Sequence, residues 1–567
     1  CIMYQGMVKV EIFKKPVFWL MLILSLAAFL RFYKIGQVPP SLNWDEVAIG
    51  YNAYSILETG KDEWGVSFPL LGFESFGEYK LPLFIYATIP GVAIFGLNEL
   101  GVRFAPALFG VIGVWAGYLL AKEMFKKEKV ALLTAFILAV DIWHLQITRV
   151  AFEAGLAQLL ICFSILFLLK SEKKWFFLPL SFLMACLSVY TYNSSRTFIP
   201  LFFVFAFLLN HRLFLKNKKG LFWGAVIILL FAVPLFLNYH KPVVQGRYQL
   251  ISIQSDPGFV LRINQERGEL LEKGWPPALA RLVHNKATHY AWNFSKYYFF
   301  HFTPSFLFIE GAEHTQQSVP GLGQFLWFWG PFLLLGIIIA LKKAIKKKSF
   351  PSRLLFLQIL VSPVGTAMTI NANPHALRTF CGLPAWQIII AIGVGEAIIL
   401  LKKIKKPLFQ YIIGVGMTIL FLANFTYYLH QYYLVYPKEY AHDWQYGYKE
   451  AVSYVWEKRE QYDKVFFTRD YGEPYIFFLF YTQYPPQAYQ QASKERVERY
   501  NWVWVDRIEK FYFPDFSDPG NSVLEIAQRE KGKLLFVGSP GDLPQEWIEK
   551  VVYFPNNQKA FEIGSTD

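Results

Sequence analysis

Two neighbouring carboxylates, Asp45 and Glu46, stand in the stretch SLNWDEVAIGYNAYSIL (residues 41–57), just after the first apolar segment. Asn43 and Glu46 have the spacing of a capping box, in which each side chain accepts a hydrogen bond from the other residue's amide. The sequence predicts a helix that starts at Asn43, runs to about Leu57 and stops at Gly60. The cap does not require Asp45, so this carboxylate is the stronger candidate for a general base, while Glu46 remains open between capping and catalysis.

Cationic residues with possible chemistry recur at the ends of later apolar segments. They are Lys80 in FGEYKLP, Arg149 in RVAFE, Arg196 in YTYNSSRTF, Arg247 in QGRYQLISI, and His375 and Arg378 in NPHALRTF. Arginines that converge on one membrane face can hold a phosphate through bidentate hydrogen bonds. Each one alone could equally be an interfacial anchor, and the same two interpretations apply to Arg103.

A third acid, Glu153, is expected at the outer end of a membrane span. Arg149 lies four residues earlier, so the two could pair on one helix face, or Glu153 could join Asp45 in catalysis. Carboxylates such as Asp45 and Glu153 suit Mg²⁺ or Mn²⁺. Two acids so far apart in sequence are weak evidence for a metal site, so no obligatory metal is expected.

The elements that must position these residues are apolar. Of the 567 residues 54% are hydrophobic and 17% are charged, which is typical of a polytopic membrane protein. Segments long enough to span a bilayer lie near 17–34, 81–97, 103–123, 130–147, 154–169, 175–192, 197–211, 221–239, 322–341, 354–370, 381–401 and 407–429. The leading CIMYQGM is expected to precede a start at Met7, and residues 17–30 to be a retained span rather than a removed signal peptide.

Basic clusters orient these segments in the membrane. Six clusters lie at 9–15, 126–129, 170–174, 212–219, 342–353 and 402–406, and the positive-inside rule places all six in the cytoplasm. All six clusters can lie on the cytoplasmic side only if segment 81–97, which is rich in Pro and Gly, does not cross the membrane. The sequence therefore predicts about eleven spans with a cytoplasmic N-terminus and an extracytoplasmic C-terminus. The basic residues are an orientation signal and not a nucleic-acid footprint.

The predicted fold is thus an all-α membrane core (1–429) with a small extracytoplasmic α/β domain (430–567). A first outer loop (35–102) with interfacial helices and a long outer loop (240–321) belong to the core. In the C-terminal region KVFFT (464–468), NWVWV (501–505), KLLFV (533–537) and KVVYF (550–554) are predicted strands. Segments 448–461 and 523–531 are predicted helices.

Several of these motifs together resemble a known family. WDE, TGKDEWG, EYKLPLFIYATIPGVAIFGLNELGVR and RVAFEAG are similar to motifs of family 39 glycosyltransferases of the GT-C superfamily, over roughly residues 15–400. That family includes dolichyl-phosphate-mannose protein mannosyltransferases, and the chain also looks like the aminoarabinose transferases of lipid A. The resemblance implies a GT-C-like core that takes a sugar from a polyprenyl phosphate on the outer side and inverts its anomeric centre.

The resemblance also implies roles for individual residues. Asp45 matches the first-loop general base, Glu46 completes the DE pair, and Lys80 matches a lysine near the lipid phosphate. Glu153 stands where the aminoarabinose transferases carry an aspartate. The segment matching 81–97 lies along the membrane without crossing it.

The expected function is a plasma-membrane hexosyl- or pentosyltransferase without an obligatory cofactor. Its donor would be a polyprenyl-phosphate sugar and its acceptor a protein, a glycolipid or a cell-wall polymer, with no nucleic acid involved. A transporter or flippase of a lipid-linked saccharide is the alternative, and a non-catalytic assembly subunit a third. A flippase would line a transmembrane path with charge, whereas the polar candidates here gather at span ends.

Overall fold

The computed structural model describes residues 15–256, 258–370, 374–499 and 502–566, and it divides the chain into two compact units. Unit 1 comprises the N-terminal segment to Arg31, Leu108–Thr148 and Glu153–Tyr428. Unit 2 comprises Phe32–Ala107, Arg149–Phe152 and Leu429–Asp567. Most of the predicted N-terminal basic cluster, and part of the turn that precedes His375, lie outside the described residues.

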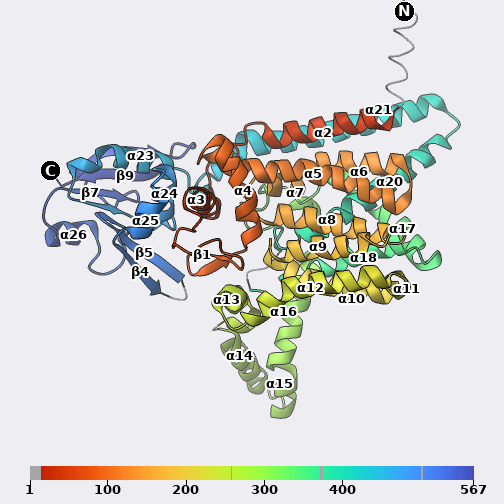
Figure 1. Cartoon of the computed structure of the whole chain (residues 1–567), viewed down its shortest axis with the longest axis horizontal. Coiled ribbons are helices and arrows are strands. Elements are labelled where there is room, and N and C mark those ends of the chain that lie inside the picture. Colours follow the sequence, from red (N-terminus) through yellow and green to blue (C-terminus); the bar gives the residue numbers. More distant parts are fainter. Residues whose placement is uncertain (1–14, 257, 371–373, 500–501, 567) are drawn as a thin grey trace, which may run out of the picture. The chain divides into compact units, whose positions relative to one another are not determined.

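Unit 1 is helical (Figure 1). Its elements are α2 (Pro16–Phe32), α5 (Glu99–Phe125), α6 (Glu128–Ala139), α7 (Ile142–Thr148), α8 (Ala154–Lys170), α9 (Phe177–Val189), α10 (Asn193–Leu209), α11 (His211–Lys216), α12 (Lys218–Leu237), α13 (Pro242–Ile251), α14 (Phe259–Glu272), α15 (Pro277–Val283), α16 (Lys286–Phe300), α17 (Gly330–Lys346), α18 (Phe350–Val361), α19 (Val364–Ala367), α20 (Ala385–Lys402) and α21 (Pro407–His430). The last residue of α2 and the first turns of α5 belong to unit 2.

Six helices in the described part of the chain are long and apolar enough to cross a membrane, and the bent pair α6–α7 would make seven. The other predicted spans correspond to the shorter apolar helices α2, α8, α9 and α10. The chain is therefore a multi-pass membrane protein, while the number eleven and the orientation of the termini stay predictions. Segment 81–97 forms α4 (Pro82–Phe95), whose 14 residues rise about 21 Å, less than the roughly 30 Å hydrocarbon core.

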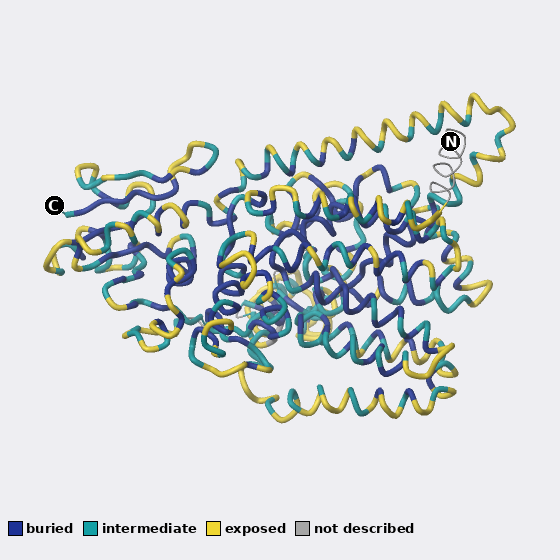
Figure 2. The backbone as a smooth tube through the Cα atoms, turned by 45° about the horizontal axis from the view of Figure 1, so that its top comes forward, coloured by how far each residue is buried: buried dark blue, intermediate teal, exposed yellow. Residues whose placement is uncertain are grey.

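The lipid-facing surface can be recognised from burial (Figure 2). Helix α12 buries only Gly220 and Gly224, and α21 only Asn424 and Tyr428, although both helices are strongly apolar. Exposed apolar side chains along whole helices would be unfavourable in water and are the expected surface toward lipid.

The predicted span 130–147 is not one straight helix, because helices α6 and α7 meet at an angle of 57°. Asp141 lies at the break, and its side chain accepts hydrogen bonds from the amide of His144 (2.7 Å) and from Gln387 (3.1 Å). Arg31 donates to the carbonyls of Leu138 and Ala139, which end α6. These buried polar side chains thus form hydrogen bonds with the backbone groups that the interrupted helix leaves without partners. Their presence in an apolar segment therefore needs no conduction path as an explanation.

Unit 2 combines the loop that follows α2 with the C-terminal region. The loop forms α3 (Trp44–Thr59), the hairpin β1 (Phe73–Ser75) and β2 (Glu78–Lys80), and α4. The C-terminal helices are α22 (Tyr436–Glu439), α23 (Tyr448–Lys458), α24 (Pro474–Tyr481), α25 (Pro486–Gln491) and α26 (Val523–Arg529). Tyr51 of α3 donates a hydrogen bond to the carbonyl of Tyr484 (2.9 Å). The loop after α2 and the C-terminal region thus belong to one compact unit, whereas the sequence placed them in two separate domains.

A seven-stranded sheet is the core of the C-terminal region. Its strands are β3 (Lys464–Phe467), β4 (Lys494–Arg499), β5 (Trp502–Ile508), β6 (Phe511–Tyr512), β7 (Leu534–Gly538), β8 (Ile548–Tyr553) and β9 (Lys559–Ser565), in the order β4-β5-β6-β3-β7-β9-β8. Strand β3 is parallel to both its neighbours, and the other pairs are antiparallel. The four predicted strands correspond to β3, β5, β7 and β8, and the two predicted helices to α23 and α26, whereas β4, β6 and β9 were not predicted.

Candidate active site

Helix α3 begins as the sequence predicts. The side chain of Asn43 accepts a hydrogen bond from the amide of Glu46 (3.0 Å), and the Glu46 carboxylate accepts one from the amide of Asn43 (3.3 Å). The helix ends at Gly60, which adopts a left-handed conformation with φ of 68°. The predicted capping box and stop are therefore both confirmed.

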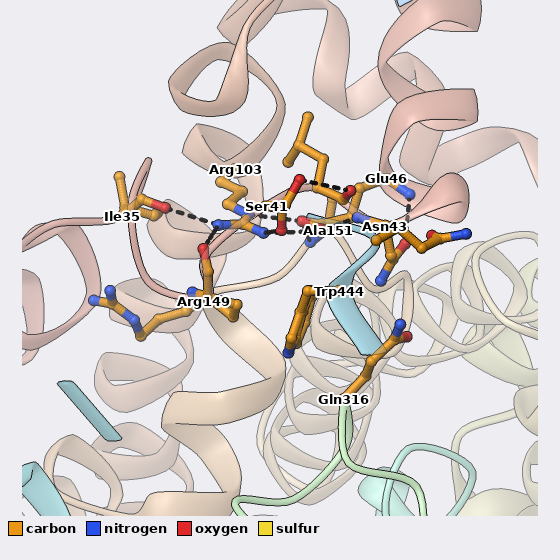
Figure 3. Close-up of polar contacts among 12 residues, drawn as sticks. Ile35, Ser41, Asn43, Glu46, Arg103, Arg149, Ala151, Gln316 and Trp444 are labelled. Carbon is orange, nitrogen blue, oxygen red and sulfur yellow. Dashed lines mark hydrogen bonds and ion pairs between the residues drawn. The ribbon is translucent and has the colours of Figure 1, made fainter. Parts of the chain in front are cut away.

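Glu46 is buried and forms an ion pair with Arg103 (Figure 3). The Nε and Nη2 atoms of Arg103 each donate to one carboxylate oxygen at 2.9 Å, and the amide of Ala151 donates to Oε1 at 3.0 Å. Both oxygens of Glu46 are thus occupied by the protein. We therefore assign Glu46 to the framework of the site and not to catalysis.

Arg103 is equally committed to the protein. Its remaining donors reach the main-chain carbonyls of Ile35, Pro39 and Ser41. Its guanidinium lies 5.7 Å from the ring centroid of Trp444. The sequence suggested an interfacial anchor or a phosphate ligand, and Arg103 is neither. Its hydrogen bonds hold the segment that precedes α3 in place within unit 2.

Asp45 has a different environment from its neighbour. It forms an ion pair with Lys80; its side chain is 38% exposed, while that of Lys80 is only 6% exposed. The pair therefore places a carboxylate beside an ammonium group, with the acid the more exposed of the two. The structure thus brings together the two residues, 35 positions apart, that the sequence singled out as base and phosphate ligand.

The hairpin β1–β2 positions Lys80. Its turn residues Phe76 and Gly77 both have positive φ, 57° and 84°, as a two-residue turn of type I′ requires. Lys80 at the end of β2 pairs in register with Phe73. The ammonium lies 5.8 Å from the centroid of the Phe76 ring, so the turn residue also provides an aromatic face for the cation.

The C-terminal region supports both elements of this site. Gln445 accepts a hydrogen bond from the amide of Trp44 (2.7 Å), the first residue of α3. The ring of Trp502 stacks on Phe76 with centroids 5.8 Å apart, and its indole N–H donates to Glu473. Burial raises the pKa of Glu473 to about 8. Sequence reasoning missed these residues because no motif surrounds them and their partners lie in a distant loop.

Arg149 differs from its prediction. Residues 149–152 precede α8, which starts at Ala154, so Arg149 and Glu153 do not share a helix face. Arg149 is buried and donates to the hydroxyl of Tyr432 (3.0 Å) and to the carbonyls of Tyr33 (2.9 Å) and Val38 (2.8 Å). These contacts give it a structural role in unit 2. Glu153 stands at the N-terminus of α8 in unit 1.

Unit 1 brings the other three predicted arginines together. Arg196, Arg247 and Arg378 line one cavity of about 190 Å³, with Tyr192 and Thr369 among its other residues. Arg378 donates to the hydroxyl of Thr369 (2.6 Å), and Arg196 to the carbonyl of Val244 (3.1 Å). Burial lowers the pKa of Arg378 from its usual value, yet a guanidinium stays charged at neutral pH. The cavity is therefore suited to an anion.

His375 is not among the residues that line this cavity. Burial and the nearby Arg378 hold the pKa of His375 well below its usual range. Its Nδ1 accepts a hydrogen bond from the amide of Arg378 (3.3 Å), and its own amide donates to His301 (3.0 Å). His375 is thus neutral and orients the segment that carries Arg378, instead of supplying a charge to a phosphate.

Comparisons with known proteins agree with the resemblance in the sequence. Residues 80–237 match the family described as dolichyl-phosphate-mannose-protein mannosyltransferase. That segment includes Lys80, Glu153 and Arg196 but begins after Asp45. No curated protein sequence matches the chain.

Solved structures share the fold of the whole chain. ArnT from Cupriavidus metallidurans bound to undecaprenyl phosphate has a TM-score of 0.53 at 12% identity, over 96% of this chain and 98% of that one. The archaeal oligosaccharyltransferase AglB from Archaeoglobus fulgidus, in complex with an inhibitory peptide and a dolichol-phosphate, has a TM-score of 0.50 at 12% identity, over 92% and 69%. The predicted resemblance to dolichyl-phosphate-mannose protein mannosyltransferases is thereby confirmed over residues 80–237, and the chain has the fold of ArnT.

Proposed function

We propose that this protein is an integral membrane glycosyltransferase that moves a sugar from a polyprenyl-phosphate donor to an acceptor at the outer face of the membrane. The observation that carries the proposal is the ion pair of a part-exposed Asp45 with a buried Lys80 at the start of α3. The family match over residues 80–237 and the ArnT-like fold support the same class of reaction.

In the proposed reaction Asp45 accepts the proton of the acceptor nucleophile while that nucleophile attacks C1 of the sugar. The new glycosidic bond forms as the bond from C1 to the phosphate oxygen breaks, which inverts the anomeric centre. A general base of this kind contributes roughly 100- to 10,000-fold to the rate. Because the leaving group is already a phosphate, it needs no proton and is stabilised by positive charge.

Lys80 is the cation that we assign to the departing phosphate. Its buried position and its place beside Asp45 and Phe76 fix the position of the ammonium group. We also assign an anionic part of the substrate to the arginine cavity of unit 1, where Arg196, Arg247 and Arg378 offer three guanidinium groups. We do not assign Arg149 or Arg103 to the substrate. Arg149 donates to main-chain carbonyls and the Tyr432 hydroxyl, and Arg103 donates to main-chain carbonyls and Glu46.

A metal between Asp45 and Glu153 is not part of the proposed mechanism. The carboxylate of Asp45 already has an ammonium partner, and a divalent cation there would have to displace or repel Lys80. We expect no increase in transfer rate when Mg²⁺ or Mn²⁺ is added to chelator-treated protein. A large, saturable increase would require a metal in the mechanism.

The experiment that tests the function uses purified protein, a polyprenyl-phosphate sugar labelled in the sugar, and a cell-envelope extract as the source of acceptors. Transfer releases polyprenyl phosphate, one molecule for each sugar moved, and gives a product of inverted configuration. Movement of intact donor across vesicles with no release of polyprenyl phosphate would instead identify a flippase. Comparing surface glycans of cells with and without the protein then identifies the acceptor.

A further inference from the structure

The long outer loop carries a helical insertion whose polar residues have no part in the proposed transfer. Helices α14, α15 and α16 project as a group from the long helices of unit 1 (Figure 1). Their apolar core is small: Ile253, Phe259 and Ile263 are its buried members, and α16 has no buried residue. An element with so little core usually depends on an additional cross-link.

Three ligand-type side chains meet within this insertion. Glu266 lies on α14, His284 ends α15, and His289 lies in the second turn of α16. The Glu266 Oε2 atom is 3.0 Å from Nδ1 of His284 and 3.1 Å from Nε2 of His289, and these two nitrogens are 2.9 Å apart. Three donor atoms, from α14, from the residue that caps α15 and from α16, therefore form a nearly equilateral triangle.

The size of this triangle fits a small divalent ion. Zinc bonds of about 2.0–2.1 Å in a tetrahedral site place the ligand atoms about 3.3–3.4 Å apart. The three donor atoms would have to move apart by only about 0.3 Å to bind the ion, which would lie above the centre of their triangle. Imidazole and carboxylate are both ligands of zinc, and a set of two His and one Glu leaves one position for water.

The surrounding residues fix the donors in place. The side chain of Arg267 donates to the carbonyl of His284 (2.8 Å for Nη2), which holds the end of α15 against α14. Asn285 caps α16 by accepting from the amides of Ala287 (2.9 Å) and Thr288 (3.1 Å), which sets the start of the helix that carries His289. The His284 and His289 side chains are only 21% and 14% exposed, while Glu266 at 45% opens the site to solvent.

From this geometry we propose that Glu266, His284 and His289 bind one zinc ion that ties α14, α15 and α16 together. Each imidazole binds through its inward nitrogen and keeps its proton on the other one, and Glu266 binds as a carboxylate. The ion replaces the apolar core that the insertion lacks, so its role is to hold the long outer loop in shape. It stands apart from the transfer chemistry, which uses none of these residues.

Zinc content of the full-length protein, purified without a polyhistidine tag and dialysed against zinc-free buffer after loading, tests this proposal. We expect about one zinc per chain in the wild type and none retained in His284→Ala or His289→Ala. The loss in affinity should exceed the roughly 10- to 100-fold cost of removing an outer-shell partner. His240→Ala changes an exposed histidine close to the insertion and is the matched control, expected to keep its zinc.

A second measurement covers the case in which the variants fold poorly. Trypsin cleavage at Lys273, which follows α14, should accelerate several-fold when a chelator removes zinc from the wild type, and readdition of zinc should reverse it. A wild type that holds no zinc, or variants that hold as much as the wild type, would overturn the proposal. So would a cleavage rate that the chelator leaves unchanged in zinc-loaded protein.

Discussion

The two ion pairs at the start of α3 involve neighbouring residues and have opposite characters. Glu46 and Arg103 are fully buried, and their donors and acceptors are shared among main-chain groups. Asp45 and Lys80 form a pair in which the acid remains 38% exposed. Successive residues of a helix point about 100° apart. Two adjacent acids in one turn can therefore face different surroundings, one the protein core and the other a ligand. Adjacent carboxylates therefore need not share a function.

The largest expected effect on stability comes from breaking the buried pair. Glu46→Gln leaves the charge of Arg103 buried without a counterion, which costs about 3–5 kcal/mol in the free energy of unfolding. Thermal unfolding of the detergent-solubilised protein should show a marked loss of stability. The double variant Glu46→Leu/Arg103→Met removes both charges and should recover part of that loss. If the single variant is as stable as the wild type, the framework role of Glu46 is wrong.

Lys80→Met breaks the other pair and should act on activity instead. Loss of a charged hydrogen bond to the departing phosphate should lower kcat/KM by roughly 10- to 100-fold, with little change in the unfolding temperature. Lys61→Met, which changes an exposed lysine of the same loop, is the control. Equal rates for the two variants would remove Lys80 from the phosphate site.

The pH dependence of stability should reveal the buried acid that supports this hairpin. Burial raises the pKa of Glu473 to about 8 from 4.5, so the folded state binds a proton that the unfolded state releases. The stabilisation from this proton uptake is complete below pH 4.5. As the pH rises from 4.5 to about 8, the free energy of unfolding falls by about 1.4 kcal/mol per pH unit. Glu473→Gln cannot ionise and should show a shallower decrease between pH 5 and 8. An identical slope in both proteins would contradict the raised pKa.

The smallest effect is expected in the arginine cavity of unit 1. Arg378→Gln removes one of three guanidinium groups, so the affinity for a polyprenyl-phosphate donor should fall by roughly tenfold, with kcat nearly unchanged. Binding of labelled lipid to the purified variant measures this directly. Arg353→Gln, in which the changed arginine lies outside the cavity, is the control; an effect of the same size there would argue against a specific anion site.

Local features of this site could be predicted from the sequence. The cap at Asn43, the stop at Gly60 and four strands of the C-terminal sheet depend on residues close together in the chain, and the structure has them. The choice of Asp45 over Glu46 followed from the same local reasoning, since a cap uses only one of two adjacent acids.

Other features depended on distant partners. Arg103 meets Glu46 across 57 positions, and Arg149 leaves the predicted helix to bind carbonyls of the chain near Val38. The break at Asp141 requires Arg31 from another helix to satisfy freed carbonyls. No periodicity records such contacts, because a buried arginine and an interfacial arginine look alike in a sequence.

The central claim, that Asp45 is the catalytic base, is tested most directly by the single-turnover transfer rate of Asp45→Asn. Glu460→Gln, an exposed acid of the same unit, serves as the matched control, and only preparations with the unfolding temperature of the wild type are compared. The account predicts a loss of roughly 100- to 10,000-fold for Asp45→Asn and none for the control. Transfer by Asp45→Asn at the rate of the wild type would contradict it.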